Sequence, residues 1–364
     1  ENKFIGEKTP VTLDQITPSI IRDTSKCVLC GRCVARCNAI HGTGILGFEN
    51  RGFNTIVAPA ENRSFADSPC ILCGQCVSVC PTGALMEKSE IDKVDEAKKA
   101  GKYIVVQTAP AVRAALGEEF GMKIGTPVTG KMVAALRRLG FDKVYDTNFA
   151  ADLTIMEEAN ELLSRIQNNG VLPMITSCSP GWVNYAEYYY GDQLDHLSSC
   201  KSPHQMQGAI IKSYFAEKQG IDPKNICVVS IMPCTAKKYE KERPELENDG
   251  MKDVDIVLTT RELAKLIKRS GINFNKLPDE EFDQDIMGEY TGAGVIFGAT
   301  GGVMEAALRT AYFALTGKEH EAIKFEEVRG MKGLKEATFN IAGKEIKVAV
   351  ASGMRNAKVL LEQM

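Results

Sequence analysis

The chain has 364 residues, of which 44% are hydrophobic and 25% charged, with a formal net charge of −3 at pH 7. This composition is that of folded soluble domains; it excludes disordered and fibrous proteins and offers no broad basic surface, so we expect no nucleic-acid partner. No stretch approaches the roughly 18 apolar residues of a membrane span, and the first ten residues lack a signal-peptide core, so we expect a cytoplasmic protein.

Eight of the twelve cysteines lie in two runs that repeat one spacing. The runs are Cys27-x2-Cys30-x2-Cys33-x3-Cys37 and Cys70-x2-Cys73-x2-Cys76-x3-Cys80, the second followed by Pro81. This is the spacing of bacterial two-cluster ferredoxins, in which the fourth cysteine of each run binds the other [4Fe–4S] cluster. We therefore expect one cluster on Cys27, Cys30, Cys33 and Cys80, and another on Cys70, Cys73, Cys76 and Cys37. A pair of zinc sites is the alternative, because C-x2-C pairs also suit tetrahedral zinc.

The pattern of apolar, charged and cysteine residues changes along the chain. Residues 1–90 are predicted to form an α+β ferredoxin-like N-terminal module. Residues 87–102 read as a charged helical linker without an apolar stripe wide enough for a core helix. Residues 91–364 alternate apolar runs with helix-period segments, which predicts an α/β domain with mostly parallel sheets flanked by helices.

Four strands are predicted in the α/β domain, at residues 103–110, 171–180, 225–234 and 345–353. Each ends in a turn with Pro, Gly or Cys. Because reactive groups of open α/β sheets collect at the carboxyl ends of the strands, we expect these turns to meet in one crevice. The spacing of the cysteines does not say which of the two clusters faces it.

Two of the turns carry unusual residues, TSCSPGW at 176–182 and MPCTAKKYE at 232–240. They resemble the first two signature motifs of the [FeFe]-hydrogenases, and the resemblance runs from about Pro18 to Met364. It includes the segments at 146–159, 201–210, 288–309 and 328–337. The resemblance implies a hydrogenase domain that reversibly oxidises H2 and reduces protons at an H-cluster, a [4Fe–4S] cubane joined to a di-iron unit with CO and cyanide ligands. Its electrons would pass through the two N-terminal clusters.

The resemblance also assigns residues to the H-cluster. Cys234 would bind the cubane, and Lys237 would donate charge-assisted hydrogen bonds to a cyanide. The cluster pocket would be lined by Ala109, Pro110, Ala111, Met232, Pro233 and Phe297. His204 has two readings, a hydrogen bond to a cluster sulfur or cyanide, or a polar side chain satisfied within the protein.

Proton delivery needs a relay, and the resemblance implies one through Arg165, Glu161, Ser198, Glu158 and Cys178. Glu158, Glu161 and Arg165 are spaced i, i+3 and i+7, so one helix face can carry them. An ordinary exposed i,i+4 ion pair is the alternative for Glu161 and Arg165. Cys200 and Cys227 are expected to be structural, and the glycine-rich turn of 298–309 is expected to serve tight packing.

The chain departs from the family pattern in two places. Ser179 stands where the family has a second cysteine that binds the cubane, and hydroxyl oxygen is a poor ligand for iron–sulfur clusters. Either Cys178 takes the ligand role, or the cluster is bound weakly, or this residue has been changed. The family's third motif, with two more cysteines, is expected just past Met364; we therefore expect a longer chain in nature.

Two functions are expected from these observations. The first is an [FeFe]-hydrogenase subunit whose electron partner is a ferredoxin, an NAD-linked flavoprotein or a formate dehydrogenase subunit. The second is a non-catalytic iron–sulfur electron-transfer or scaffold protein that has lost the H-cluster. The sequence does not choose the partner, the direction of catalysis or the oligomeric state.

Overall fold

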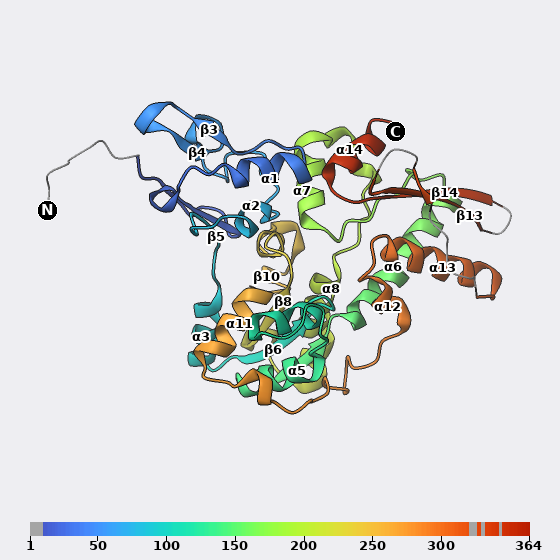
Figure 1. The fold of residues 1–364 in the computed structure, drawn as a ribbon. Coiled ribbons are helices and arrows are strands. Elements are labelled where there is room, and N and C mark those ends of the chain that lie inside the picture. The colour runs from blue at the N-terminus through green and yellow to red at the C-terminus, as the bar shows by residue number, and fades with distance from the viewer. Residues whose placement is uncertain (1–9, 320–325, 329–331, 342–343) are drawn as a thin grey trace, which may run out of the picture.

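The structure, a computed structural model, describes residues 10–319, 326–328, 332–341 and 344–364 (Figure 1). Residues 1–9 of the predicted N-terminal module and residues 329–331 of the motif at 328–337 lie outside the described residues. We call residues 10–90 the cysteine module. The division of the chain near residue 90 stays a prediction.

The cysteine module is built from short strands, two helices and a hairpin. Its elements are β1 (Leu13–Asp14), β2 (Ile20–Asp23), α1 (Arg32–Ile40), β3 (Gly47–Glu49), β4 (Ile56–Ala58), α2 (Gln75–Ser78) and β5 (Leu85–Glu87). β1, β2 and β5 form one antiparallel sheet, and β3 pairs with β4. Gly31 and Gly74 precede α1 and α2 with φ of 71° and 73°, a conformation that glycine adopts without steric cost. This confirms the ferredoxin-like module.

A four-stranded parallel sheet forms the core of the α/β domain. Its strands are β6 (Tyr103–Thr108), β7 (Lys143–Asp146), β8 (Ile226–Met232) and β11 (Ile256–Thr259), in the order β11-β8-β6-β7. Both central strands, β6 and β8, are almost wholly buried, as expected for a sheet covered on both faces. The flanking helices are α3 (Ile91–Lys99), α4 (Val112–Ala115), α5 (Thr129–Arg138), α6 (Asn148–Gln167), α8 (Pro203–Ile210), α9 (Ala216–Gln219) and α11 (Thr260–Arg269). The predicted α/β fold class is confirmed.

A second, smaller layer lies beside α6 (Figure 1). It contains α12 (Gly292–Ile296), α13 (Gly302–Thr316), β12 (Glu326–Glu327), β13 (Leu334–Ile341) and β14 (Lys344–Ala351). Nearer α1 lie α7 (Pro180–Tyr189) and α14 (Met354–Leu361), which share one apolar cluster through Tyr185 and Leu361. α13 packs along α6, and β12, β13 and β14 form an antiparallel sheet. A Cβ at Gly302 would lie 1.9 Å from the carbonyl oxygen of Ile296, which agrees with the tight packing expected for this glycine-rich turn. The remaining short elements are α10 (Lys237–Glu240), β9 (Glu247–Asn248) and β10 (Met251–Lys252).

Three details of the prediction are wrong. Residues 171–180 form no strand beyond the single bridge of Ile175 with Leu197, because Pro173 lacks a backbone N–H to donate. The strand at 345–353 pairs in the antiparallel β13–β14 hairpin rather than in the parallel sheet. The linker helix α3 buries Ile91 and Val94 in the main core, so two apolar residues suffice to dock it.

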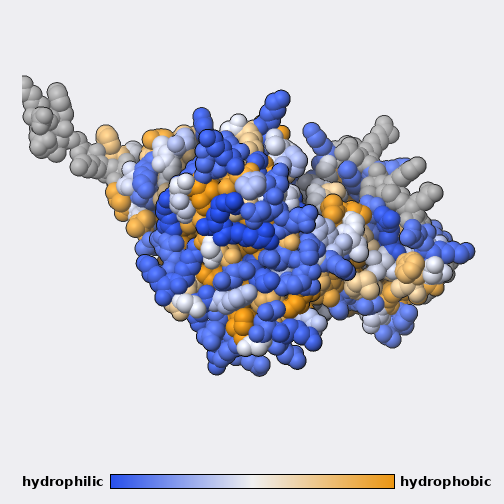
Figure 2. All heavy atoms as spheres, turned by 90° about the horizontal axis from the view of Figure 1, so that it is seen from below, coloured by the Kyte–Doolittle hydropathy of each residue, from blue (hydrophilic) through white to orange (hydrophobic). Residues whose placement is uncertain are grey.

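The outer face below α3 and α5 is mainly hydrophilic, with apolar residues in scattered spots (Figure 2). Such isolated apolar residues are ordinary on a protein surface. Among the described residues, no helix combines the length and apolar character that crossing a bilayer requires.

Candidate functional site

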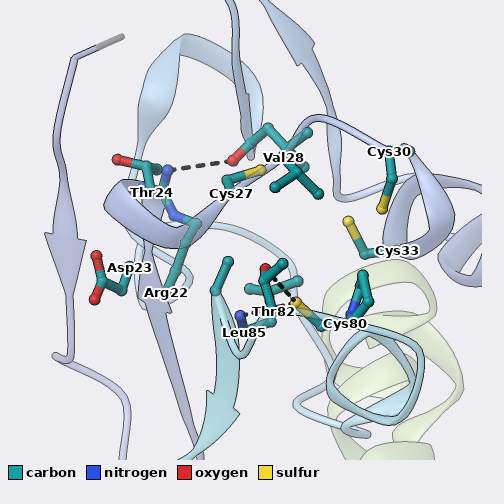
Figure 3. A pocket seen from close by; sticks show the side chains of 14 residues that line it. Arg22, Asp23, Thr24, Cys27, Val28, Cys30, Cys33, Cys80, Thr82 and Leu85 are labelled. Carbon is teal, nitrogen blue, oxygen red and sulfur yellow. Dashed lines mark hydrogen bonds between the residues drawn. The ribbon is translucent and has the colours of Figure 1, made fainter. Parts of the chain in front are cut away.

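Four thiols of the cysteine module line one cavity (Figure 3). They are Cys27, Cys30, Cys33 and Cys80, and we call them the outer quartet. Cys30 is exposed, while burial raises the pKa of Cys33 to about 11. Cys80 has a pKa below its ordinary value. Burial acts to raise this pKa, but hydrogen bonds from backbone N–H groups, including that of Leu85 at 3.4 Å, together lower it by more. The fold thus brings together the crossed set that the spacing predicts.

The other crossed set, Cys70, Cys73, Cys76 and Cys37, forms the inner quartet. Burial raises the pKa of Cys70 to about 12 and that of Cys73 to about 11, and it raises the pKa of Cys76 further. The charge of Cys37 contributes to the raised pKa at all three positions, which places its thiol beside theirs.

Both quartets fit [4Fe–4S] clusters better than zinc. A zinc ion draws its thiolates to about 2.3 Å from one point. No three metal-binding side chains among the described residues are spaced to hold a single ion. A cubane takes one thiolate at each of four separate corners, and soft thiolate suits its irons. Because cluster binding requires thiolates, the raised pKa values mean that the irons must displace protons from buried thiols. The assignment of the eight ligands stays a prediction that this arrangement supports.

The inner quartet lies against the turn that carries Cys234. Thr235 donates its hydroxyl to the carbonyl oxygen of Leu72 at 3.0 Å, and a Cβ at Gly74 would lie 2.5 Å from that hydroxyl. The charge of Cys234 also contributes to the raised pKa of Cys73. The structure therefore answers a question that the spacing leaves open, since the inner quartet faces the turn at 232–240.

Lys237 joins the two turns that carry the family motifs. Its Nζ donates to the carbonyl oxygen of Cys178 at 2.9 Å and to Oε2 of Glu240 at 2.8 Å. Burial raises the pKa of the Cys178 thiol to about 11, an effect that Glu158 increases and Lys237 opposes. Burial likewise raises the pKa of Cys234. The thiols of Cys178 and Cys234 thus share Lys237 as a charged neighbour.

His204 is fully occupied within the protein. Its Nε2 donates to the carboxylate of Glu240, and its Nδ1 accepts from the hydroxyl of Ser230 at 3.2 Å. Burial and the charge of Lys237 lower the pKa of His204. The pKa of Glu240 is lowered to about 2. Burial acts to raise it, but the interactions of Glu240 with Lys237 and His204 together lower it by more. Both ring nitrogens of His204 therefore have partners within the protein, and its contact with a cluster stays a prediction.

Glu161 and Arg165 form a partly buried clamp rather than an ordinary surface pair. Their side chains are 16% and 15% exposed and meet at 2.7 Å. Arg165 also donates to the carbonyl oxygens of Val171, Asp195 and Leu197. This clamp holds α6 against the segment that leads to Ser198.

Glu161 connects this clamp to the interior. Its Oε2 accepts from the hydroxyl of Ser198 at 2.7 Å and from the thiol of Cys200 at 3.6 Å. One helical turn away, Glu158 is 1% exposed, and burial and the charge of Glu161 raise its pKa to about 7. The three predicted relay residues of α6 therefore lie along one helix, and the charge of Glu158 contributes to the raised pKa of Cys178. That they relay protons stays a prediction.

A cavity of about 1640 Å³ opens beside this path. It lies between α6, α7, α13, the β13–β14 hairpin and α14. Glu158, Ser179, Trp182, Met304 and Met364 are among the residues that line it. Ser179 is the residue that precedes α7, and it lines the cavity at the start of this helix.

The predicted cluster-pocket residues fall into two groups. Ala109 and Pro110 follow β6, Met232 and Pro233 end and follow β8, and the N–H of Ala109 donates to the carbonyl oxygen of Ile231 at 3.0 Å. Ala111, next along the chain, is exposed. Phe297 follows α12, whose packing is with α6 and α13 rather than with the strand ends. The fold therefore brings the β6 and β8 residues together and leaves Phe297 on another element.

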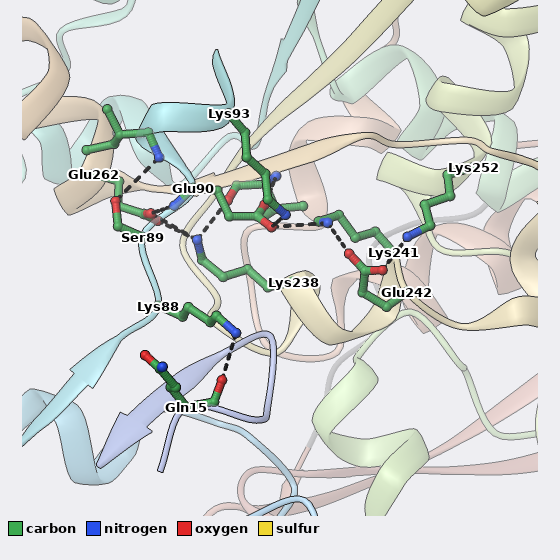
Figure 4. A network of polar contacts seen from close by, with 12 residues as sticks. Gln15, Lys88, Ser89, Glu90, Lys93, Lys238, Lys241, Glu242, Lys252 and Glu262 are labelled. Atoms are coloured by element: carbon green, nitrogen blue, oxygen red, sulfur yellow. Dashed lines mark hydrogen bonds and ion pairs between the residues drawn. The ribbon is translucent and has the colours of Figure 1, made fainter. Parts of the chain in front are cut away.

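Sequence reasoning missed a buried network of charged groups (Figure 4). Lys238 and Glu262 are 0% exposed and pair at 2.8 Å, and Glu262 also accepts from the N–H of Glu90 at 2.8 Å. Glu90 in turn pairs with Lys241 at 3.2 Å. The network ties the end of the cysteine module to the helix that follows Cys234. Glu240, also missed, stands i+3 from Lys237, a spacing that points to such a pair.

Comparisons with known proteins agree over the whole chain. A family model described as iron only hydrogenase large subunit, C-terminal domain, matches residues 102–364, and one described as 4Fe-4S dicluster domain matches residues 26–84. The chain is 55% identical over 369 residues to the NADP-reducing hydrogenase subunit HndD of Solidesulfovibrio fructosivorans, covering 100% of this chain and 63% of that protein. It is 51% identical over 354 residues to iron hydrogenase 1 of Clostridium pasteurianum, covering 97% and 62%.

The chain is also similar to a solved structure and to a more distant relative. A solved structure of the [FeFe]-hydrogenase HydA1 from Chlamydomonas reinhardtii superposes with a TM-score of 0.67 at 42% identity, covering 74% of this chain and 78% of that one. A protein of Nematostella vectensis named as a probable cytosolic Fe-S cluster assembly factor is 31% identical over 274 residues, covering 72% and 62%. The chain spans less than two thirds of the length of HndD and of the clostridial enzyme.

Proposed function

The chain belongs to the iron-only hydrogenase large-subunit family, and we propose that it serves the reversible oxidation of H2 and reduction of protons. The proposal is supported by two sets of groups that lie near Cys178. The inner quartet adjoins the turn of Cys234, which Lys237 links to Cys178, and α6 leads its carboxylates to the same place. An H-cluster bound there would supply the di-iron centre at which H2 is made or split.

Electrons would pass from the outer quartet to the inner quartet and on towards Cys234. Two [4Fe–4S] clusters accompany the dicluster domain, and each transfers single electrons. Thr235, packed on the inner loop, holds the receiving turn against it.

Protons would travel along Arg165, Glu161, Ser198 and Glu158 to Cys178. A relay member exchanges protons most readily when its pKa is near the working pH, and Glu158 has a pKa of about 7. Glu161 stays ionised because its hydrogen bonds from Ser198 and Ser199 and the adjacent Arg165 outweigh burial and lower its pKa. Lys237 would hold its positive charge towards the site.

The complete set of H-cluster ligands is a question about the full-length protein. The described residues contribute the thiols of Cys178 and Cys234, and Ser179 contributes a hydroxyl. The family's cubane takes more thiolates than these two. We therefore assign to this chain only the pocket wall, the relay and these thiols.

A gas and infrared experiment tests the proposal. The full-length protein, matured with the di-iron assembly machinery, should evolve H2 from reduced viologen and show infrared bands of CO and cyanide. Absence of both the bands and the gas from protein that contains its [4Fe–4S] clusters would refute the proposal.

The relay has its own test in Glu158→Gln, with Glu157→Gln as the matched control, because Glu157 is the exposed neighbour on α6. Loss of a positioned acid–base group lowers the rate by about 10²–10⁴-fold. In the parent, a residue with a pKa of about 7 holds its proton below pH 7 and loses it above. H2 evolution should therefore fall as the pH rises through 7, and the infrared bands should persist in Glu158→Gln.

The second candidate is a non-catalytic iron–sulfur protein. Ser179 favours it, together with the similarity to the protein named as an assembly factor. In that case the full-length protein would contain about four irons in each of only two sites. Ser179→Cys distinguishes a lost ligand from a lost function, since it should create the infrared bands only if the other ligands are present.

Two further proposals concern the partner and the location. The name of HndD places that relative in an NADP-reducing hydrogenase with other subunits, which favours an NAD-linked flavoprotein among the predicted partners. Affinity purification of the full-length protein under anaerobic conditions should recover a flavin-containing subunit. A cytoplasmic location stays a prediction, which fractionation of the native cells tests.

A further inference from the structure

Glu240 is a buried carboxylate that is neither a proposed ligand nor a member of the proposed relay. Its side chain is 6% exposed, and its Oε2 accepts from Nζ of Lys237 at 2.8 Å and from Nε2 of His204. With a pKa of about 2, Glu240 is ionised at neutral pH. A buried charge is tolerated when it is paired and hydrogen-bonded, so Glu240 and Lys237 compensate each other inside the protein.

The ammonium group of Lys237 is held on two sides. An ammonium has three N–H donors and no acceptor. One N–H goes to the carboxylate of Glu240, and another goes to the carbonyl oxygen of Cys178 at 2.9 Å. In the part of the chain that the structure describes, Nζ has no third acceptor. Two bonds fix the position of Nζ, and one N–H remains for a group outside these residues.

His204 holds the carboxylate of Glu240 from the other side. The ring is 1% exposed, and its Nδ1 accepts from the hydroxyl of Ser230 at 3.2 Å. The backbone carbonyl oxygen of His204 accepts from the side-chain amide of Gln107 at 2.8 Å. Ser230 lies in β8 and Gln107 in β6, so both central strands anchor this residue. A ring whose Nδ1 accepts a hydrogen bond carries its proton on Nε2, which faces Glu240.

We propose that Glu240, oriented by His204, is a positioning residue for Lys237 and leaves the third N–H of its ammonium for a cyanide ligand of the H-cluster. The inference rests on the proposed function, because the H-cluster would supply that ligand. Without the carboxylate, Lys237 would be a partly buried cation whose single partner is a carbonyl oxygen. Its side chain is 12% exposed, so its long stem can carry the ammonium towards water. The hydrogen bond to cyanide would then weaken although Lys237 is unchanged.

The test compares Glu240→Gln, which removes the charge and keeps the shape, with Glu242→Gln as its matched control. Glu242 also pairs with two lysines, Lys241 and Lys252, and it also has a pKa of about 2. The two variants therefore make the same change in net charge two residues apart, and only one of them touches Lys237. Equal iron content in the full-length, matured protein shows that both variants are loaded.

Infrared spectroscopy measures the effect on the cyanide ligands. The cyanide bands should shift in Glu240→Gln and keep the parent's positions in Glu242→Gln. Lys237→Met removes the donor and sets the largest shift. The double variant Lys237→Met/Glu240→Gln should have the cyanide bands of Lys237→Met, because a residue that acts through Lys237 has no further effect once Lys237 is gone. A further shift in the double variant would overturn the proposal.

His204 provides a second pair of variants, which tests the proposal even where Glu240→Gln does not fold. A glutamine can place its amide nitrogen where Nε2 lies and keep the donor to Glu240, whereas an asparagine reaches only the position of Nδ1. The cyanide bands should therefore shift in His204→Asn and stay near the parent's in His204→Gln. Equal spectra of these two variants would contradict the assigned role of His204.

Crystal structures of the protein with only its [4Fe–4S] clusters separate this inference from the proposed function. Nζ of Lys237 should leave the carbonyl oxygen of Cys178 in Glu240→Gln and stay there in Glu242→Gln. Absence of cyanide bands from the parent and from every variant would refute the proposed function, while the position of Nζ would still test whether Glu240 positions Lys237. An Nζ that keeps its place in Glu240→Gln would overturn the inference.

Discussion

The outer and inner cysteine quartets share one spacing, yet the fold gives them different surroundings. The outer quartet has an exposed member in Cys30 and a thiol of lowered pKa in Cys80. The inner quartet holds Cys70, whose pKa burial raises to about 12, and its loop is packed on Thr235 of the α/β domain. The spacing of a motif determines which ligands meet, whereas contacts distant in the sequence determine what each cluster faces. We infer that electrons enter at the outer quartet and leave from the inner one.

Removing one thiolate from each quartet should give the largest effect. Cys76→Ala and Cys33→Ala are matched, because both residues stand third in their runs and both are 8% exposed. Each variant should fall from about eight irons in the two [4Fe–4S] sites to about four. Cys76→Ala should lose H2 evolution with both viologen and a protein donor, since the inner cluster adjoins the Cys234 turn. Cys33→Ala should lose it mainly with the protein donor. A greater loss with viologen in Cys33→Ala would reverse the assigned order of the quartets.

The second effect compares how much a buried ion pair and an exposed ion pair contribute to the free energy of unfolding. On the inner side, Glu262→Gln would leave Lys238 charged and unpaired where both side chains are 0% exposed, which should cost about 3–5 kcal/mol of unfolding free energy. On the outer side, Arg63 pairs with Glu61 at 55% and 74% exposure, and Arg63→Gln should cost at most about 1 kcal/mol. Chemical denaturation of the cluster-loaded proteins measures both. Similar costs would mean that the buried network does not hold the inner side.

The third effect tests the two loop glycines. An alanine in the left-handed conformation costs about 1–2 kcal/mol at either position. At Gly31 its Cβ would lie 3.1 Å from the ring of Phe48, which can turn away, whereas at Gly74 it would lie 2.5 Å from the Thr235 hydroxyl. Gly74→Ala should therefore destabilise by about 1–3 kcal/mol more than Gly31→Ala, as overpacked sites do.

Thr235→Ala tests whether the hydroxyl of Thr235 causes the loss of stability in Gly74→Ala. In the Gly74→Ala/Thr235→Ala double variant, the overlap disappears and part of the stability should return, an interaction energy of about 0.5–3 kcal/mol. Thermal unfolding measures each variant. Strict additivity of the two single substitutions would show that the inner loop does not press on Thr235.

The sequence predicted local chemistry better than distant packing. The crossing of Cys37 and Cys80 between the quartets follows from spacing alone, and the i, i+3 and i+7 positions of Glu158, Glu161 and Arg165 place them on one helix. Residues 171–180 have the apolar character of a strand, but the missing N–H of Pro173 leaves only one bridge. The pairing of Lys238 with Glu262, and the hydrogen bond of Glu262 to residue 90, join segments that no local pattern relates. Their burial is set by the packing of α3 and α11 on the sheet.

The smallest effect is a difference in thiol reactivity within the metal-free protein. Only the thiolate reacts with iodoacetamide. The pKa of Cys80 is lowered, whereas that of Cys70 is about 12, so Cys80 should react at least about ten-fold faster at pH 8. This difference exceeds the opposing effect that thiolates of lower pKa are weaker nucleophiles. As the pH rises, alkylation of Cys80 should level off first, whereas that of Cys70 should keep rising. Mass spectrometry of timed samples measures both. Cys227, buried in β8 with a pKa that burial raises to about 12, serves as the internal reference. Equal reaction of Cys70 and Cys80 while Cys227 stays protected would show that the two quartets differ only when their clusters are bound.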